Sequence, residues 1–348
     1  MSIRQRVITM GFEAIAMTKA DRWLAPLARG RGVILMFHHV RPWTPRGFAP
    51  NRLLEITPDF LDTVLGQVRG LGFDIVPLSE VPDRLRGSPG SRPFAALTFD
   101  DGYRDNATFA QPILTRYAAP WTLFVTTSFA DGTGRLWWRE LEESIRRLDR
   151  VRVPSVGIDL SAGTDAQKAA VFEAVYWSLR AGPEEQLLAA IAGLADEAGL
   201  DGARLTREHC LDWEGLAAVA RDPLVTIGAH TLTHPMLAKH DDATALREIR
   251  ESRRIIESRL GRTVDHFAYP VGDVTSAGPR DFALAREAGF ATAVTTRPGH
   301  VFAGHAHHLH ALPRVSVNGN FQDAAAVRAL LSGVPFLAWN RGHRLDVD

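Results

Sequence analysis

Short apolar runs alternate with helical patterns along most of this chain. The runs are rich in Val, Ile, Phe and Thr and are often bounded by Gly or Pro, which is typical of strands buried in a parallel sheet. We expect strands at Val33–Phe37, Asp74–Val76, Phe94–Phe99, Thr122–Val125, Val225–Ala229, Phe267–Tyr269, Ala291–Thr295 and Val315–Val317. Helical periodicity is clear over Asp59–Gly70 and Asp242–Leu260, where Gly261 marks the stop. This alternation predicts an α/β fold with a mainly parallel sheet.

The alternation fails between Thr126 and Arg221. Helical patterns dominate there, around Gln167–Arg180 and Pro183–Gly199. We therefore expect an N-terminal extension over residues 1–30, an α/β domain over residues 31–330 with a helical insertion at about 131–220, and a C-terminal tail over residues 331–348. The Pro- and Arg-rich segment Arg41–Asn51 is expected to be a long surface loop.

The first residues predict a loosely amphipathic helix. Its apolar residues fall on one broad face: Ile3, Val7, Ile8, Phe12 and Ile15. No signal peptide is evident, because Glu13 and Lys19 break the apolar run and no clear cleavage site follows. We expect this helix to pack on the domain, with contact to a membrane surface as the alternative. The expected location is the cytoplasm or the inner face of a membrane.

Composition narrows the classes of partner. The 40 Lys and Arg residues balance 40 Asp and Glu residues, so no overall positive field favours nucleic acid. Nothing in the sequence indicates an obligate protein partner. The single cysteine, Cys210, excludes an intrachain disulfide and a cysteine metal site, and it is expected to be an inert buried residue.

Three segments place chemically active residues at the carboxyl ends of expected strands, where barrels and open sheets build their sites. The first is TFDDG at Thr98–Gly102. A turn at Gly102 can bring Asp100 and Asp101 into one pocket, where a cation would relieve the repulsion of the two carboxylates. The alternative is that one Asp caps the helix that follows.

The other two segments supply histidines. In HTLTH, His230 and His234 are separated by three residues, so that both imidazoles can reach one ion; the alternative is two ordinary surface histidines. The strand ending in MFHHV carries His38 and His39, of which one should face the strand-end pocket and the other should face away. An Asp-His-His site leaves coordination positions open for water and substrate.

TFDDG and HTLTH resemble the first two motifs of the polysaccharide deacetylase family, the NodB-homology domains of carbohydrate esterase family 4. MFHHV resembles the branch that includes the poly-N-acetylglucosamine deacetylases. The resemblance implies a distorted (β/α)7-type barrel and a divalent metal, most often zinc, with cobalt or nickel as alternatives. It implies Asp101, His230 and His234 as ligands, Asp100 as the general base and His38 as the general acid, with His39 as the second choice.

The third motif departs from the family pattern, which reads Arg-x-Pro-Tyr. The matching stretch Phe267–Asp273 has Ala268 in place of the Arg and Val271 in place of the Tyr. The Arg normally orients the base. Arg314, in the stretch Leu312–Ser316, could supply that contact; the alternative is that Arg314 makes an ordinary surface ion pair. The oxyanion contact can survive, since it uses the backbone N–H of Val271. Tyr103 is a further candidate for lining the site.

Other groups have weaker claims. Trp137 and Trp138 could stack on sugar rings, although such residues more often fill a core. The stretch with His300, His305, His307, His308 and His310 is expected to be a polar surface loop and not a second metal site.

The predicted function is therefore hydrolytic removal of acetyl groups from an N-acetylated glycan. The alternatives are an O-deacetylase, an amidohydrolase of non-sugar amides, and a non-catalytic glycan-binding relative.

Overall fold

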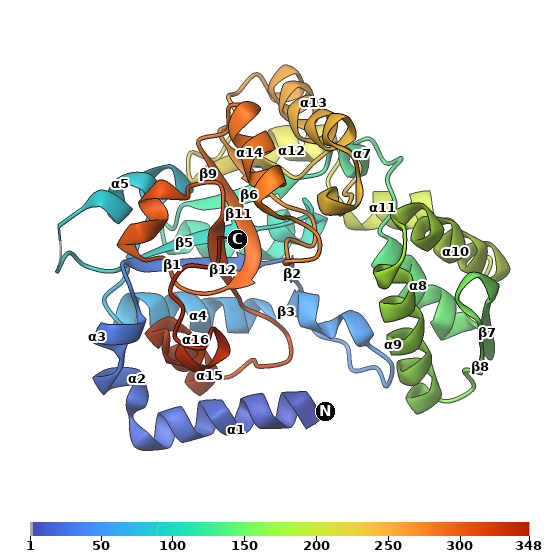
Figure 1. The fold of residues 1–348 in the computed structure, drawn as a ribbon, viewed down its shortest axis with the longest axis horizontal. Coiled ribbons are helices and arrows are strands. Elements are labelled where there is room, and N and C mark those ends of the chain that lie inside the picture. Colours follow the sequence, from blue (N-terminus) through green and yellow to red (C-terminus); the bar gives the residue numbers. More distant parts are fainter. Residues whose placement is uncertain (1–2, 89, 348) are drawn as a thin grey trace.

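Seven parallel strands close into a barrel in the computed structural model, which describes residues 3–88 and 90–347 (Figure 1). Their order around the barrel is β1 (Gly32–Phe37), β12 (Leu312–Ser316), β11 (Thr292–Pro298), β10 (His266–Ala268), β9 (Val225–Ala229), β6 (Trp121–Val125) and β5 (Phe94–Phe99). The barrel is closed because β5 also pairs with β1. The short strand β4 (Asp74–Ile75) joins the start of β5. The expected fold class is confirmed, and the expected strands differ from these only at their ends.

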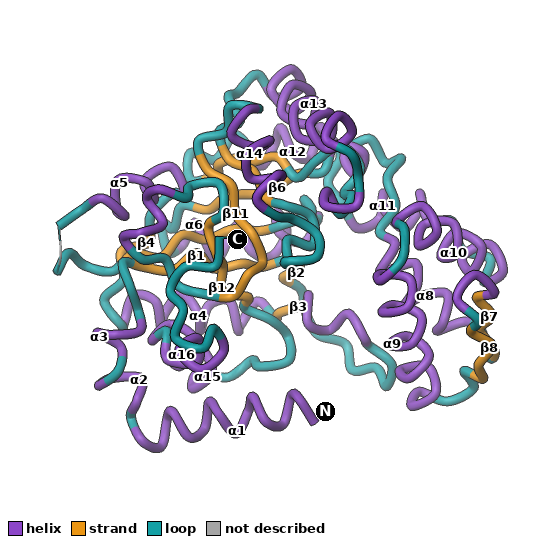
Figure 2. The backbone as a smooth tube through the Cα atoms, in the orientation of Figure 1, coloured by secondary structure: helices purple, strands orange, loops and turns teal. Residues whose placement is uncertain are grey.

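Helices surround the strands (Figure 2). They are α4 (Pro58–Gly70), α5 (Val81–Arg86), α6 (Gln111–Arg116), α7 (Thr127–Ala130), α12 (Trp213–Val219), α13 (Asp242–Leu260), α14 (Pro279–Glu287), α15 (Ala324–Ser332) and α16 (Val334–Trp339). A minor parallel pair, β2 (His39–Val40) with β3 (Glu55–Ile56), follows the end of β1.

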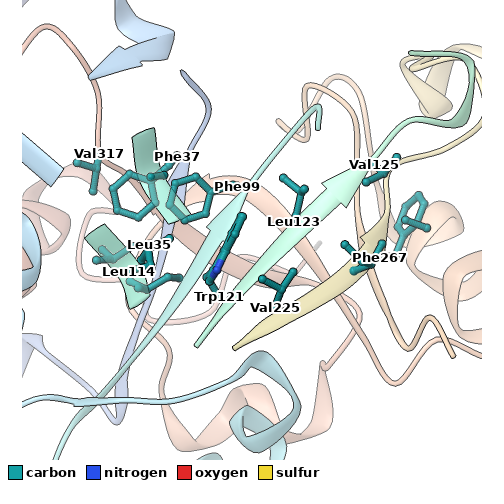
Figure 3. Close-up of a cluster of buried hydrophobic side chains, with 14 of the residues drawn as sticks. Leu35, Phe37, Phe99, Leu114, Trp121, Leu123, Val125, Val225, Phe267 and Val317 are labelled. Atoms are coloured by element: carbon teal, nitrogen blue, oxygen red, sulfur yellow. The ribbon is translucent and has the colours of Figure 1, made fainter. Parts of the chain in front are cut away.

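Strand side chains divide into two apolar sets by alternation. One set packs between the strands and the helices and includes Leu35, Phe37, Phe99 and Trp121; the Phe37 and Phe99 rings stack with centroids 4.8 Å apart (Figure 3). The other set fills the barrel interior: Ile34, Ala96, Phe124, Ala268, Val294 and Leu312. Strands buried on both faces must be apolar throughout, which explains their continuous apolar runs.

Beside the barrel stand α8 (Trp137–Arg147), the antiparallel hairpin of β7 (Arg150–Val153) and β8 (Ile158–Ser161), α9 (Asp165–Ala181), α10 (Glu184–Glu197) and α11 (Gly202–His209) (Figure 1). These elements lie within the segment that we call the helical insertion, residues 131–220. All of them except α11 contribute to a second apolar cluster, in which Trp137 and Trp138 are buried. The cluster also includes residues from outside the insertion: Phe48, Tyr103, Phe129 and Met236. The last helix of the segment, α12, packs in the main core instead.

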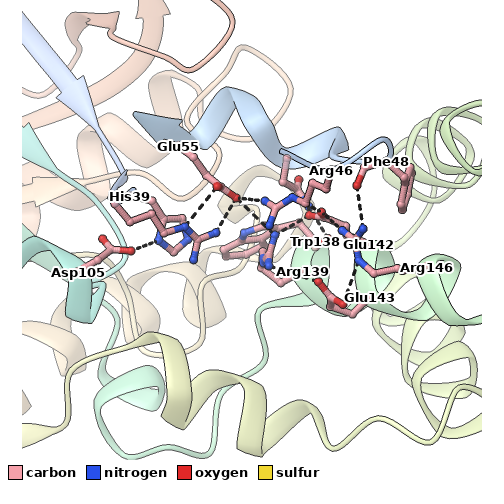
Figure 4. A network of polar contacts seen from close by, with 12 residues as sticks. His39, Arg46, Phe48, Glu55, Asp105, Trp138, Arg139, Glu142, Glu143 and Arg146 are labelled. Atoms are coloured by element: carbon pink, nitrogen blue, oxygen red, sulfur yellow. Dashed lines mark hydrogen bonds and ion pairs between the residues drawn. The ribbon is translucent and has the colours of Figure 1, made fainter. Parts of the chain in front are cut away.

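A buried ion network joins the barrel to the helical insertion (Figure 4). Glu55 on β3 accepts hydrogen bonds from Arg41 and Arg46, each at 2.6 Å. Arg139 on α8 lies 3.7 Å from the same carboxylate and 2.6 Å from Glu142. A buried charge is tolerated only when it is paired and hydrogen-bonded, so these side chains depend on one another across the junction.

At the N-terminus, α1 (Ile3–Thr18) packs on α15 and is followed by α2 (Ala20–Trp23) and α3 (Ala25–Ala28). Phe12 is buried against Ala326 and Ala329, with Ile8 and Ile15 beside it. The apolar face expected for this helix was too broad, because the Val7 side chain is 58% exposed. The side chain of Ile3, also assigned to that face, lies outside the described residues. Within residues 3–88 and 90–347, no helix is both long and apolar enough to cross a membrane.

The expectation of a polar surface loop for the His-rich stretch is wrong for two of its residues. His300 and His305 are buried. The ring nitrogens of His300 lie 2.9 and 2.8 Å from the carbonyl oxygens of Arg29 and Leu330. His300 thereby connects the N-terminal segment and α15 to the barrel. The sequence pattern alone does not distinguish a buried histidine of this kind from one in a solvated loop.

Leu97→Ala tests the barrel core. Leu97 lies on β5 and is fully buried, so the substitution should lower the free energy of unfolding by about 2–5 kcal/mol. Urea unfolding measures the change, with Leu188→Ala on the exposed side of α10 as the control. Equal stabilities for the two variants would contradict this packing.

Candidate metal and catalytic site

The turn after β5 gathers two carboxylates. Asp100 continues the strand, and its N–H donates to the carbonyl oxygen of Phe37. Asp101 and Gly102 then take positive φ angles of 71° and 65°. The left-handed region is unfavourable for a residue with a side chain, and such strain persists where the surrounding structure enforces it, often at functional sites. The reversal of direction brings the neighbouring carboxylates to the same end of the barrel.

The loop after β9 carries the two histidines of HTLTH. Thr231 and His234 have φ angles of 66° and 65°, and the Thr231 hydroxyl accepts a hydrogen bond from the His234 N–H. Buried Glu248 on α13 accepts hydrogen bonds from the N–H groups of Leu232 and Thr233, each at 2.9 Å. The loop conformation is therefore held by hydrogen bonds from its own side chains and from α13.

Asp101, His230 and His234 converge. One potential ligand atom from each lies within 4.8 Å of the others, and all three residues are buried. Asp101 Oδ1 is 3.5 Å from His230 Nε2 and 3.4 Å from His234 Nε2. Two imidazole nitrogens and one carboxylate oxygen form a donor set typical of catalytic zinc.

Two details indicate that these residues fit a cation. His230 Nδ1 lies 2.6 Å from the carbonyl oxygen of Ala268, to which it must donate, so Nε2 is the nitrogen that faces Asp101 and could offer its lone pair to a cation. Asp101 Oδ1 is buried, and among the described residues it has no hydrogen-bond partner. A buried carboxylate oxygen without a partner is costly, and a cation at this point would satisfy it.

Arg314 lies against Asp100. Its guanidinium donates to both carboxylate oxygens at 2.7 Å, and also to the Thr98 hydroxyl and the Thr295 carbonyl oxygen. Burial raises the pKa of the Asp100 carboxyl, but the charge of Arg314 and its hydrogen bonds outweigh burial, so that the pKa falls below its ordinary value. Asp100 is thus held as an oriented carboxylate by Arg314, the candidate replacement for the third-motif Arg, and Arg314 is buried and not part of a surface ion pair.

His38 and His39 face opposite sides. His38 Nε2 lies 4.0 Å from Asp100 Oδ2, and the side chain is 17% exposed. His39 is buried, its Nδ1 lies 2.6 Å from Asp105 Oδ2, and its ring stacks on Tyr103 with centroids 3.5 Å apart. Burial lowers the pKa of His38, while the charges of Asp100 and Asp101 act against this shift. His38 is the histidine of the pair that faces the carboxylates.

The remaining candidates are placed differently. Tyr103 is fully buried beneath His39, and burial raises the pKa of its hydroxyl well above the ordinary value, so it supports the site without an exposed surface for substrate. Val271 is partly exposed and has a φ angle of 62°, a strained conformation for a β-branched residue. Burial raises the pKa of Cys210 well above its ordinary value, as expected for an inert thiol.

Some supporting residues could not be found from the motifs. The rings of Phe129 and Trp138 lie 5.6 and 4.8 Å from that of His234. Asp105, four residues after Asp101, holds His39. Glu248 lies in the middle of a regular helix, where the sequence gives no reason to distinguish it from a solvent-exposed glutamate. The sequence marks Trp138 only as a candidate for sugar stacking, and Asp105 could have been noticed because it lies three residues after TFDDG.

Comparison with known proteins identifies the class. A family model described as polysaccharide deacetylase matches residues 87–293, which is more than half of the chain. The chain belongs to the polysaccharide deacetylase family, as the motifs TFDDG and HTLTH predicted. Family membership makes it a hydrolase of the polysaccharide deacetylase type. A search of curated proteins gave no match.

Solved structures support the fold. The Streptococcus pyogenes deacetylase PplD in complex with acetate is 18% identical, with a TM-score of 0.55 over 83% of this chain and 93% of that chain. IcaB from Ammonifex degensii is 17% identical, with a TM-score of 0.53 over 87% and 98% of the two chains. A de-N-acetylase from Aggregatibacter actinomycetemcomitans is 14% identical, with a TM-score of 0.53 over 84% and 97%. At these identities the likeness concerns the fold.

His234→Ala tests the ligand set. Removing one of three protein ligands should reduce bound zinc from about one ion per chain to near zero. Metal analysis after dialysis measures the content, and His308→Ala, at an exposed position, is the matched control. Full occupancy in the His234 variant would show that the ion binds elsewhere.

Proposed function

We propose that this chain is a metal-dependent N-deacetylase, which hydrolyses the acetamide of an N-acetylated sugar in a polysaccharide or oligosaccharide and releases acetate. One observation carries the proposal. A buried Asp-His-His cluster lies beside a carboxylate, Asp100, that a bidentate arginine holds in its ionised form. This combination supplies a cation site and a base at one barrel end.

Asp101, His230 and His234 would hold the cation. Zinc suits two imidazoles and one carboxylate, and cobalt or nickel are the natural substitutes. A divalent ion bound there polarises the acetamide carbonyl and lowers the pKa of water. The protein contributes the orientation, because the His230–Ala268 contact and the Thr231–His234 contact fix the ligands before substrate arrives.

Asp100 would act as the general base. A carboxylate offers about four lone-pair positions, and Arg314 uses only two of them, so Asp100 can still accept a proton from water. Arg314 also prevents the carboxylate from turning away. The charge that develops on the acetamide oxygen would be met by the Val271 N–H, which comes from the loop after β10.

His38 would donate a proton to the departing nitrogen. It is partly exposed and lies 4.0 Å from Asp100, while His39 is already paired with Asp105. His38 would begin as the imidazolium, the form that the charges of Asp100 and Asp101 favour and that burial opposes. Asp100 would gain one proton from water as His38 gives up one, so the total charge of the pair is unchanged. An amine leaves poorly without protonation, so a histidine at this position favours amide over ester substrates. One structural neighbour is described as a de-N-acetylase, which agrees with this preference.

A substrate panel tests the activity. The chain is stripped with a chelator, reloaded with zinc and given N-acetylglucosamine oligomers, an O-acetylated oligosaccharide and a small acetamide. We expect acetate release from the N-acetylated oligomers, loss after chelation and recovery with zinc. Faster release from the ester, faster release from the small amide, or no release from any substrate would each refute the proposal.

Asp100→Asn tests the base. The amide cannot accept the proton from water, so kcat should fall by about 10²–10⁴-fold while bound zinc is retained. Steady-state acetate release and metal analysis measure the two effects. Asp83→Asn, on the exposed surface, is the control. A rate near that of the unaltered chain would exclude Asp100 as the base.

A further inference from the structure

The junction between α9 and α10, residues 180–184, lies between two loops of the site. On one side the Arg180 guanidinium lies 2.8 Å from Asp273 Oδ2, in the loop that carries Val271. On the other side both carboxylate oxygens of Glu184 accept hydrogen bonds from the Met236 N–H, at 3.1 and 3.0 Å. Met236 follows His234 by two residues. One short segment of the helical insertion therefore contacts both loops.

The contact with the ligand loop is extensive. Glu184 Oε2 lies 2.7 Å from His240 Nε2. In the opposite direction, Lys239 Nζ donates hydrogen bonds to the carbonyl oxygens of Arg180 and Gly182, at 2.5 and 2.6 Å. Glu184 is buried, so its charge depends on these partners. The segment from Met236 to His240 is thereby fixed to the junction at several points.

The contact with the third-motif loop is preorganised. The Arg180 side chain is largely buried, and its guanidinium lies 5.6 and 5.4 Å from the ring centroids of Tyr176 and Trp177. The second oxygen of Asp273 accepts hydrogen bonds from the N–H and hydroxyl of Thr275. The carboxylate thus joins the helical insertion to the turn that follows Val271.

The turn at Val271 is held from two sides: the Thr296 hydroxyl on β11 donates to the Val271 carbonyl oxygen at 2.7 Å, and the helical insertion contacts Asp273. Val271 has a strained φ angle of 62°, which persists only where surrounding contacts impose it. The Arg180–Asp273 pair is a charged contact at 2.8 Å that holds the turn from outside the barrel.

We propose that the α9–α10 junction is a positioning element that fixes the His230–His234 loop relative to the Val271 loop, with Arg180 and Glu184 as its two positioning residues. The inference rests on the proposed function for its kinetic readout. Its physical basis is that catalytic groups on separate loops act together only when their spacing is held within a fraction of an ångström. The helical insertion is then part of the catalytic architecture.

The two residues should have different effects. Arg180→Gln releases the Val271 loop and leaves the ligand loop in place. Because a complete loss of one oxyanion donor costs 10²–10³-fold in kcat, a misplaced donor should cost about 10-fold or more, with zinc affinity unchanged. Arg180→Lys should recover part of the rate. Arg204→Gln, in an exposed ion pair on α11, is the matched control.

Glu184→Ala should act on the metal instead. Without its carboxylate the Met236 N–H and His240 lose their shared partner, and the zinc dissociation constant should rise about 10–100-fold. Isothermal titration of the full-length chain with zinc measures this without any substrate. Glu184→Gln keeps an oxygen acceptor and should bind zinc more tightly than the Ala variant. Glu185→Ala, at an exposed neighbouring position, is the control.

A double variant tests whether Arg180 acts through its ion pair with Asp273. If Arg180 acts through Asp273, then Arg180→Gln combined with Asp273→Asn should reduce kcat no further than either change alone. Circular dichroism and thermal unfolding confirm that each variant is folded. The inference is overturned if folded Arg180→Gln has an unaltered kcat, or if Glu184→Ala and Glu184→Gln both bind zinc normally. Absence of deacetylation by the unaltered chain would refute the proposed function, while the zinc titrations would still decide the role of Glu184.

Discussion

In a closed parallel barrel, successive strand residues must point alternately to the interior and to the surrounding helices. Most of the site follows from this constraint. Ile34 lies inside the barrel and Phe37 outside, which places His38 on the interior side and His39 on the exterior side. The same alternation directs Asp100 and Arg314 inward from β5 and β12, which are not neighbours in sequence. Asp100, Arg314 and His38 therefore meet because the alternation along their strands points all three side chains into the barrel.

The family's third-motif arginine is absent here, and an arginine on a different strand contacts Asp100 instead. The contact that orients Asp100 needs a guanidinium in the barrel interior, and several strands can supply one. Here it comes from β12, and hydrogen bonds to Thr98 and Thr295 hold it in the plane of the carboxylate. Bidentate geometry suits arginine and not lysine, which limits what could replace Arg314.

Sequence patterns predicted the strands of the main sheet for a clear physical reason, and the resemblance to the family implied the cluster of Asp101, His230 and His234. Strands buried on both faces leave continuous apolar runs, and the residues that follow them are brought to one end of the barrel by closure. The same reasoning could have chosen between His38 and His39 by counting from Ile34. It could not identify Glu248 or Glu184, because a carboxylate on a helix looks solvated until a partner loop is placed over it. Burial of His300 depended in the same way on α15 and the N-terminal segment, which are distant in sequence.

The ion network around Glu55 has a consequence for how this chain can be divided. A barrel cut away from the helical insertion would keep Glu55 with Arg41 and Arg46 but lose Arg139, while the excised helices would carry Glu142 without Asn51. Each fragment would expose charges and apolar surface that evolved to face each other. The barrel and the helical insertion therefore depend on each other for the pairing of buried charges, and a boundary for expression is better placed outside both than between them.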